Sequence, residues 1–425
     1  MKVLITGSGG REHALAWAVS RSPVVERVYV APGNGGTEEV GTNVAISSEQ
    51  PEALAAFCLE EGIELVVLGT DGSVAAGVGD AMRANGIPCF GPNRAAGQIE
   101  TSKAFSKQLM ADAGIPTAPF GVFTDHRQAR AFADRFEGRV AVKADGLALG
   151  KGVLICHNPQ DAGKAIDRCL REGAFGDAGR TIVVEQLLTG RELSVFGITD
   201  GVRVLPFAAA RDYKRALDAD EGPNTGGMGA YSPPIDADDA LIWEAVERVL
   251  TPAVRALADR GMRYRGVLYA GMMLTDEGMM TLEFNARFGD PEAQAIFPRF
   301  RGDLVPLLLA AANGDLLGQL PPAFDPRPAV AVVVTSGGYP ERYATGFLVD
   351  GVDDVPENVI IFHAGTRREA TGLVTAGGRV VTVVAMDEDV AGARRSALEA
   401  AGRVAFSRAF HRTDIAKEAE EAAHA

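Results

Sequence analysis

The stretch that decides the fold reads VKADGLALGKGV, at residues 142–153. An apolar strand is expected over 139–143, and it delivers Lys143 to a glycine-rich loop that returns into a second strand over 152–156. The backbone N–H groups of such a loop can cover phosphates while the lysine neutralises their charge. The stretch therefore predicts a nucleotide phosphate site, with a solvated hairpin as the simpler alternative.

This stretch is not a Walker A loop. The spacing from Gly146 to Gly150 is one residue short of that motif, and Gly152 stands where it requires Ser or Thr. The predicted nucleotide site therefore belongs to another class.

A second stretch, LEFNARFGDPE at residues 282–292, has the features of a metal site. On a strand, Glu283 and Asn285 face one side while Phe284 faces the core. Two neighbouring oxygen ligands suit Mg²⁺, which takes its remaining ligands from phosphates and water. Arg287 lies on the same face and could stabilise developing charge. A wet strand face is the alternative, but the continuation into Gly-Asp-Pro favours a site.

Two further segments point to substrate contacts. The run VVEQLLTGRE at 183–192 is a strand that ends in a loop, which would leave backbone groups free to read an adenine edge and Glu192 to accept from ribose hydroxyls. Residues 206–235 carry no periodicity but contain a charged run at 212–215 and a glycine-dense run at 222–229. An irregular stretch of this length predicts a substrate-closing loop, with a surface excursion as the alternative.

Near the N-terminus, residues 7–13 read GSGGREH, between a strand at 2–6 and a helix at 11–20. Such a turn offers backbone N–H groups to an anion. A dinucleotide site is disfavoured because Glu12 occupies the third glycine position, and residues 31–33 lack the acid expected after the second strand.

Alternating apolar and amphipathic segments up to about residue 92 predict a doubly wound α/β domain, and β-rich composition after Pro321 predicts a small C-terminal domain. Other strands are expected at 27–31, 64–69, 87–90, 181–186, 193–199, 202–205, 266–275, 279–285, 328–335, 359–363, 373–375 and 378–385. Other helices are expected at 51–61, 73–85, 101–113, 159–172, 237–260 with a break at Pro252, 302–312 and 389–402. The tail after Ile415 is expected to fray.

Composition narrows the function. The net charge of −14 over 425 residues makes nucleic acid a poor partner. The four cysteines form no CxxC pair, so a disulfide scaffold or zinc site is not expected. The chain opens directly into a strand with no signal peptide, and no apolar run reaches membrane length. These observations predict a cytoplasmic enzyme that acts on small molecules and does not bind a membrane.

In their sequences and in their order along the chain, these segments resemble the phosphoribosylamine–glycine ligase family of the ATP-grasp superfamily over nearly the whole chain. The most specific matches are at residues 143–153, 222–233 and 283–292, with support at 9–17, 31–34, 174–179 and 362–366.

The resemblance implies a reaction and an architecture. The family's reaction, part of purine biosynthesis, joins glycine to 5-phosphoribosylamine with ATP, through an acyl phosphate, and needs Mg²⁺ or Mn²⁺. The implied fold is α/β and α+β multidomain: an N-terminal doubly wound α/β domain (1–100), an ATP-grasp lid and central domain (101–325, lid about 118–190), and a small β-rich C-terminal domain (326–425). We expect a monomer.

The resemblance, together with the motifs, assigns roles to individual residues. ATP contacts are expected at Lys103, Lys143, Gly146, Lys151, Gly152, Glu185, Leu187 and Glu192, with backbone groups of Glu185 and Leu187 reading adenine. The metal ligands are expected to be Glu283 and Asn285, and the catalytic residues Arg287, Asp212 and Lys214. The other substrates are expected to meet Gly9, Gly10, Asp71, Gly226, Gly227 and Asp290.

The chain departs from the family pattern at three places. Residues 69–74 read GTDGSV where the family shows G-P-E-x-P-L, Thr101 replaces a glycine, and Tyr213 replaces the histidine of D-H-K-R. The departures leave two alternatives open: a related ATP-grasp ligase with a different amine substrate, and a nucleotide-binding regulatory protein without catalysis. The intact ATP and metal motifs speak against the second.

Overall fold

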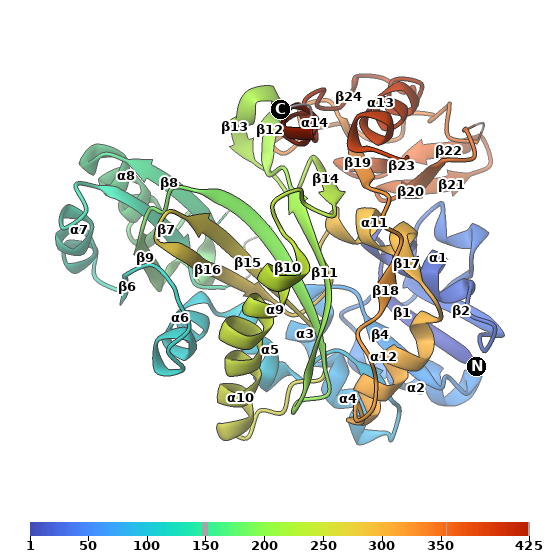
Figure 1. Ribbon diagram of the computed structural model, residues 1–425, viewed down its shortest axis with the longest axis horizontal. Coiled ribbons are helices and arrows are strands. Elements are labelled where there is room, and N and C mark those ends of the chain that lie inside the picture. Colours follow the sequence, from blue (N-terminus) through green and yellow to red (C-terminus); the bar gives the residue numbers. More distant parts are fainter. Residues whose placement is uncertain (147–151, 354, 424–425) are drawn as a thin grey trace.

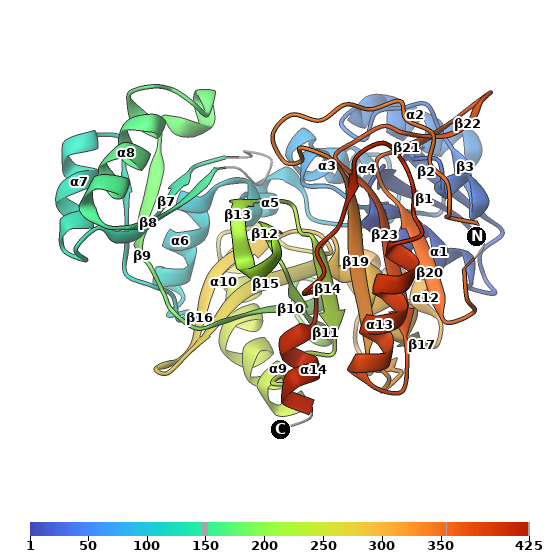
Figure 2. The same ribbon diagram turned by 90° about the horizontal axis from the view of Figure 1, so that it is seen from above.

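The computed structural model describes residues 1–146, 152–353 and 355–423. Its described part contains three large sheets, of five, nine and four strands. Figures 1 and 2 show the four-stranded sheet and the five-stranded sheet at opposite ends of the molecule. Lys151 and the rest of the glycine loop at 147–151 lie outside the described residues.

The N-terminal sheet is parallel, with strand order β3-β2-β1-β4-β5. Its strands are apolar runs because helices cover both faces, as in other doubly wound sheets. Gly77 adopts a left-handed φ of +86° and divides the helix predicted over 73–85 in two. The elements are β1 (Lys2–Gly7), α1 (Gly10–Ser20), β2 (Arg27–Pro32), β3 (Thr42–Asn43), α2 (Pro51–Glu61), β4 (Leu65–Leu68), α3 (Asp71–Ala76), α4 (Val78–Ala84) and β5 (Cys89–Phe90).

A four-stranded antiparallel sheet, ordered β6-β9-β7-β8, stands to one side in Figure 1 with two helices and a hydrophobic core of its own. We refer to it as the lid sheet. Its strands β7, β8 and β9 were predicted, whereas β6 and α7 were not. The elements are β6 (Phe120–Phe123), α7 (His126–Asp134), β7 (Arg139–Ala144), β8 (Val153–His157), α8 (Pro159–Leu170) and β9 (Ile182–Gln186).

The nine-stranded sheet runs β16-β15-β10-β11-β14-β19-β23-β20, with β24 pairing to β19. Pairing of β14 with β19 joins the C-terminal strands to the central ones, so the predicted small C-terminal domain shares a sheet with the centre. The strands are β10 (Arg191–Thr199), β11 (Val204–Asp212), β14 (Gly229–Ser232), β15 (Gly266–Thr275), β16 (Gly278–Asn285), β19 (Ala329–Ser336), β20 (Val359–His363), β23 (Arg379–Met386) and β24 (Ala409–Phe410).

The prediction of an irregular stretch over 206–235 was wrong. This stretch holds most of β11, all of β14, and the hairpin β12 (Arg215–Leu217) and β13 (Glu221–Asn224). Only the start of β11 was predicted, within the strand expected over 202–205. The rest was missed because both faces of β11 are largely buried, so its sequence does not alternate between apolar and polar residues.

Apart from the helices at 94–101 and 292–296, which were not predicted, the helices around this sheet follow the predicted pattern. The long helix expected over 237–260 is interrupted as predicted, by a π-helical turn at Val246–Leu250 just before Pro252, which has no N–H for the helical ladder. The helices are α5 (Arg94–Thr101), α6 (Lys103–Asp112), α9 (Asp239–Ala245), α10 (Thr251–Asp259), α11 (Glu292–Ile296), α12 (Leu304–Asn313) and α13 (Val390–Ala401).

The expected fraying of the C-terminal tail does not occur over the described residues. Residues after Ile415 form α14 (Lys417–Ala423), which packs against α13. Ile415, Ala416 and Ala419 are fully buried in a hydrophobic cluster with β19 and α13. Short pairs complete the fold: β17 (Phe300–Arg301) with β18 (Ala323–Phe324), and β21 (Thr366–Glu369) with β22 (Gly372–Thr375). No helix in the described parts of the chain is long and apolar enough to cross a membrane.

Candidate active site

The main cavity, of about 1260 Å³, is bounded by the lid sheet, the central strands, helices α5 and α6, and the C-terminal segment. It collects most of the residues singled out from the sequence. Those that line it are Asp71, Lys103, Lys143, Gly146, Gly152, Glu185, Leu187, Glu192, Asp212, Lys214, Gly226, Glu283, Asn285, Arg287 and Asp290. Gly9, Gly10 and Gly227 do not line it.

One wall of the main cavity carries a buried triad of charges, which we call the lysine triad. The carboxylate of Glu185, on β9, contacts Lys143 from β7 and lies 2.5 Å from Lys107 Nζ of α6. All three side chains are at most 6% exposed. Burial alone would raise the pKa of Glu185, but the two ammonium groups outweigh it and hold this pKa below its usual value. The pKa of Lys107 is lowered by burial and by the neighbouring Lys143.

The backbone groups of Glu185 and Leu187, which were predicted to contact adenine, already have backbone partners in the lid sheet. Strand β9 is paired on both sides at Glu185, and the N–H of Leu187 donates to Arg139 O at 3.0 Å. The sequence indicated a strand end at this point but could not show that β9 lies in the middle of its sheet. What faces the cavity here is the side chain of Glu185 and the loop from Leu187 to Glu192.

Asp145 of the glycine-loop motif explains how Lys103 is positioned. Asp145 Oδ1 accepts from Ser102 Oγ at 3.0 Å and from the N–H of Ala104 at 3.1 Å. It therefore binds the first turn of α6, on which Lys103 is the first residue. Lys103 Nζ lies 3.5 Å from Gly146 O, at the mouth of the loop.

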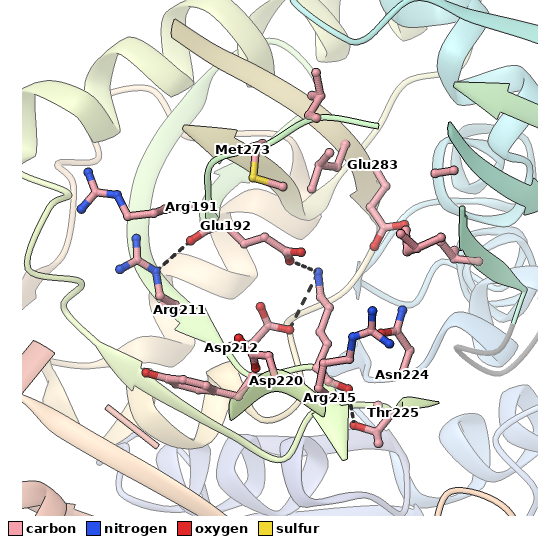
Figure 3. A pocket seen from close by; sticks show the side chains of 18 of the residues that line it. Arg191, Glu192, Arg211, Asp212, Arg215, Asp220, Asn224, Thr225, Met273 and Glu283 are labelled. Carbon is pink, nitrogen blue, oxygen red and sulfur yellow. Dashed lines mark hydrogen bonds and ion pairs between the residues drawn. The ribbon is translucent and has the colours of Figure 1, made fainter. Parts of the chain in front are cut away.

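The opposite wall holds a more open charge cluster. Lys214 Nζ donates to Glu192 Oε2 at 2.5 Å and lies 4.0 Å from Asp212 Oδ2. In Figure 3 the dashed lines from Glu192 and Asp212 converge on one nitrogen, and Glu283 extends from β16, a strand of the same sheet. Burial raises the pKa of Asp212 to about 7, against the opposing effect of Lys214. The carboxylates nearby raise the pKa of Lys214 well above its usual value, although burial opposes them.

The predicted metal ligands are found on β16 as expected, facing the main cavity. Burial would raise the pKa of Glu283, but Lys214, Lys143 and Lys103 hold it below its usual value, so Glu283 is a carboxylate. Asn285 Oδ1 accepts from Arg287 Nη2 at 2.8 Å. Within the described residues, no three His, Cys, Asp or Glu side chains gather as a metal site. The pair of oxygen donors fits an ion that keeps waters and phosphate oxygens as its other ligands.

The guanidinium of Arg287 is held by an ion pair on one side and faces the main cavity on the other. Its Nη2 lies 3.0 Å from Glu100 Oε1, whose other oxygen accepts from the N–H of Ala286 at 2.7 Å. Its buried Nε has no hydrogen-bond partner among the described residues. Glu100, which the sequence did not single out, therefore positions a guanidinium whose Nε remains free for a substrate.

A second cavity, of about 650 Å³, lies between the first strands of the N-terminal sheet and the C-terminal strands. Three supporting motifs meet beside it: Asn34 Nδ2 donates to Ser8 O at 2.9 Å and to His363 O at 2.8 Å, and the N–H of His363 donates to His13 Nδ1 at 2.8 Å. Burial lowers the pKa of His13 to about 3 and of His363 to about 4, so both imidazoles are neutral. The motifs at 9–17, 31–34 and 362–366 thus form one interface.

The remaining predicted glycines lie around this second cavity. Gly9 lines it, but its N–H donates to Glu12 Oε2 at 2.6 Å, so this N–H is not free for an anion. A Cβ on Gly10 would lie 2.5 Å from Gln294 Nε2, and one on Gly227 would lie 2.3 Å from Pro291 Cδ. Both glycines therefore permit close packing.

Asp290 and Arg379 connect the two cavities. Asp290 lines both, and its Oδ2 lies 3.0 Å from Arg379 Nη2. Arg379 Nη1 donates to Gly226 O at 2.6 Å. Arg379 and Lys107 were missed by sequence reasoning. The four-residue spacing from Lys103 to Lys107, which puts both on one helix face, was the available signal for Lys107.

Comparisons with known proteins agree with this geometry. Three family profiles match: phosphoribosylglycinamide synthetase N domain over residues 1–100, ATP-grasp (A) domain over 101–293, and C domain over 329–418. The chain is 46% identical to the phosphoribosylamine–glycine ligase of Caulobacter vibrioides, over 98% of this chain and 97% of that one.

Solved structures give the same result. The crystal structure of the phosphoribosylamine–glycine ligase of Thermotoga maritima matches with a TM-score of 0.85 and 32% identity, over 98% of this chain and 100% of that one. The biotin carboxylase domain of the Hydrogenobacter thermophilus 2-oxoglutarate carboxylase, in complex with MgADP, matches with a TM-score of 0.73 and 16% identity, over 99% of this chain and 98% of that one. At that identity the second match concerns the fold alone.

Proposed function

The chain belongs to the phosphoribosylglycinamide synthetase family, and from this premise we infer how its main cavity performs the family's reaction. The enzyme is an ATP-dependent ligase that joins glycine to 5-phosphoribosylamine in purine biosynthesis, giving glycinamide ribonucleotide, ADP and phosphate. The observation that carries the residue assignments is the single cavity in which lysines of the lid, the carboxylate and amide of β16, and the Asp212–Lys214 pair face one another.

ATP occupies the side of the main cavity next to the lid sheet. Lys103 and Lys143 meet its phosphates, and Gly146 and Gly152 line the same cavity. The adenine lies against the loop that follows β9, where Glu185 and Glu192 face the cavity. The buried lysine triad supports this placement, because Glu185 fixes the position of Lys143 before the polyphosphate arrives.

Glu283 and Asn285 hold the divalent ion, which is Mg²⁺ or Mn²⁺. A bound ion of this kind neutralises phosphate charge and orients the polyphosphate for transfer. The chain contributes an ionised carboxylate, an amide oxygen and, in Arg287, a guanidinium for developing charge. These groups act by positioning and charge neutralisation, the main sources of catalysis in phosphoryl transfer.

Phosphoribosylamine and glycine occupy the far side of the main cavity, near Asp71, Gly226 and Asp290. Gly9, Gly10 and Gly227 shape the packing behind this side, toward the second cavity. Asp212 and Lys214 lie between the two sides, where the amine meets the activated carboxyl group. A carboxyl group with a pKa raised to about 7 is suited to exchange a proton near neutral pH.

We propose a division into residues 1–100, 101–325 with a lid at about 118–190, and 326–425. The separate core of the lid sheet supports the lid boundaries. We expect a monomer. The buried free thiols of Cys58, Cys89, Cys156 and Cys169 support a reducing, cytoplasmic setting. Light scattering on the purified enzyme tests the monomer.

One assay tests the whole assignment. Phosphate release from ATP is measured with glycine and freshly made phosphoribosylamine, each omitted in turn. Release is expected only when both are present. Release that phosphoribosylamine fails to stimulate, but another amine does, would contradict the amine assignment and leave the ATP-grasp chemistry in place.

A further inference from the structure

Tyr213 lies between the two residues of the Asp212–Lys214 pair but belongs to a different environment. Its ring is 8% exposed and packs in the hydrophobic cluster of the C-terminal strands, with Tyr231, Ile415 and Ala416. Its backbone N–H donates to Gly229 O at 2.9 Å. The chain at this point is therefore anchored on one side in the C-terminal core, while its neighbours face the main cavity.

The C-terminal segment binds the hydroxyl of Tyr213. Tyr213 Oη donates to the carboxylate of Glu418, at 2.5 Å from Oε1 and 2.6 Å from Oε2, and accepts from the N–H of Ala416 at 2.8 Å. The guanidinium carbon of Arg412 lies 5.1 Å from the centre of the tyrosine ring. Every polar group of this side chain is thus satisfied by residues near the C-terminus.

The same C-terminal segment also binds the β12–β13 hairpin, which follows Lys214. Arg412 is 1% exposed and donates to Arg215 O at 3.0 Å and to Asp220 Oδ1 at 2.9 Å. Thr413 Oγ1 donates to Asp218 Oδ2 at 2.6 Å, and the N–H of Ala219 donates to Asp414 Oδ2 at 2.8 Å. Contacts at both ends of the β12–β13 hairpin make a rigid link between this hairpin and the C-terminus.

The C-terminal segment is itself fixed to the core. Arg394, on α13, donates to Thr413 O at 2.7 Å and to Ile415 O at 3.0 Å, and pairs with Glu420 at 2.9 Å. The segment therefore cannot shift without disturbing a well-packed helix. This gives it the rigidity that a supporting element needs.

We propose that the segment from Arg412 to Glu418 is a positioning element for the ligase reaction, which holds Tyr213 through Glu418 and thereby sets Asp212 and Lys214 at the cavity wall. The proposal rests on the roles assigned to Asp212 and Lys214 above. Tyr213 and Glu418, which also line the main cavity, act through their neighbours rather than by binding substrate. The Oη–carboxylate pair requires tyrosine at 213, one of the three places where the sequence departs from the family pattern.

Hydroxyl removal gives the direct test. Tyr213→Phe and Glu418→Ala are each expected to lower kcat about tenfold, the scale of one strong hydrogen bond to a charged group, with KM for ATP unchanged within about twofold. Glu418→Gln is expected to keep kcat within about twofold of wild type, because its amide oxygen still accepts from Oη. A purely structural role would not give this split between kcat and KM, nor this rescue.

A matched control lies in the N-terminal sheet. Tyr29 is 4% exposed, and its Oη donates to Glu61 Oε2 at 2.8 Å, far from the charge cluster. Tyr29→Phe removes the same kind of pair and is expected to leave kcat unchanged. An equal fall in kcat in this control, or wild-type kcat in both Tyr213→Phe and Glu418→Ala, would overturn the proposal.

Two further measurements keep the outcomes distinct. If Tyr213→Phe fails to fold, Glu418→Ala decides alone, since Glu418 is an exposed residue whose loss leaves no cavity. Lys214→Met is measured beside them. Wild-type activity in Lys214→Met overturns the role of Lys214 itself. Lost activity there, combined with wild-type kcat in Tyr213→Phe and Glu418→Ala, overturns the positioning element alone.

Discussion

The two charged walls of the main cavity are built in opposite ways. On the ATP side, Lys107, Glu185 and Lys143 are almost fully buried and neutralise one another within the lid sheet and α6. On the facing side, Lys214 is 31% exposed and Glu192 40%, and the cluster opens into the cavity. The first wall presents a fixed charge, which suits the polyphosphate that we propose to bind there. The second combines a titratable carboxyl group with support from a distant part of the chain, which suits proton transfer.

The largest expected effect breaks the buried wall. Lys107→Met leaves the Glu185 carboxylate with one cation instead of two and removes the 2.6 Å bond from Nζ to Thr117 Oγ1. Breaking a buried ion pair costs about 3–5 kcal/mol of unfolding free energy. Lys214→Met, on the open wall, is expected to cost less than about 1 kcal/mol, as exposed pairs do. Urea unfolding of both variants measures the difference, and equal costs would contradict the contrast between the walls.

The second prediction concerns the metal ligands between the walls. Glu283→Gln is expected to lower turnover at least about a hundredfold, the scale of removing one preorganised electrostatic group. Glu277→Gln, at the exposed turn of the same hairpin, is the control and should keep wild-type turnover. Steady-state kinetics across a magnesium titration measure both. Near wild-type turnover with unchanged magnesium dependence in Glu283→Gln would exclude it as a ligand.

The walls also differ in how far the sequence predicted them. The β15–β16 hairpin and its outward-facing Glu283 follow from a period of two and a turn at Asp276, so local pattern was sufficient. The sequence predicted only part of the lysine triad. Lys143 was named, but its partner Glu185 was assigned to backbone contacts, because no local signal places β9 between β6 and β7.

The facing wall depends even more on distant contacts. Strand β11 has no alternating pattern because both of its faces are largely buried, so its stretch was interpreted as irregular. The tail was expected to fray because its Ala and Glu content suggests a solvated helix. Only the folded chain brings Glu418 to Tyr213 and gives that helix a partner. Pairings between residues this far apart in sequence are set by tertiary packing, which single-sequence patterns do not encode.

The third prediction uses the titration of Asp212. Its pKa is about 7 in the folded enzyme, whereas the ordinary pKa of an aspartate side chain is 3.8, so folding favours the protonated form. The stability contribution of this group is complete below about pH 4 and is lost as pH rises to about 7. Asp212→Asn has no such loss, so its stability relative to wild type should grow over this range, by about 3 kcal/mol between pH 5 and pH 8, and level off above it. Urea unfolding at pH 5 and pH 8 measures this, and a pH-independent difference would contradict the raised pKa.

The smallest expected effect concerns Asp71, which stands where the family pattern has glutamate. Asp71 is the first residue of α3, and Thr70 caps that helix by accepting from the N–H of Ser73 at 3.0 Å. Gly72 leaves room for Glu49, whose Oε1 would lie 2.4 Å from a Cβ at this position. The loop is thus held by its own contacts although the two prolines of the family pattern are absent.

Because Asp71 lines the main cavity away from the lysine triad, its loss should affect one substrate selectively. Asp71→Ala is expected to raise KM for phosphoribosylamine about tenfold, the scale of one charge-assisted hydrogen bond, and to change KM for ATP by less than about twofold. Asp71→Glu is the matched variant: it keeps the carboxylate and extends it by one methylene, so its KM should stay within about threefold of wild type, since a bridging water can take up a change of that size. Initial rates of phosphate release, with each substrate varied in turn, give both constants. Equal increases in the two KM values after Asp71→Ala would mean that this side chain shapes the cavity as a whole. The proposed separation between the ATP site and the phosphoribosylamine site would then be wrong at this residue.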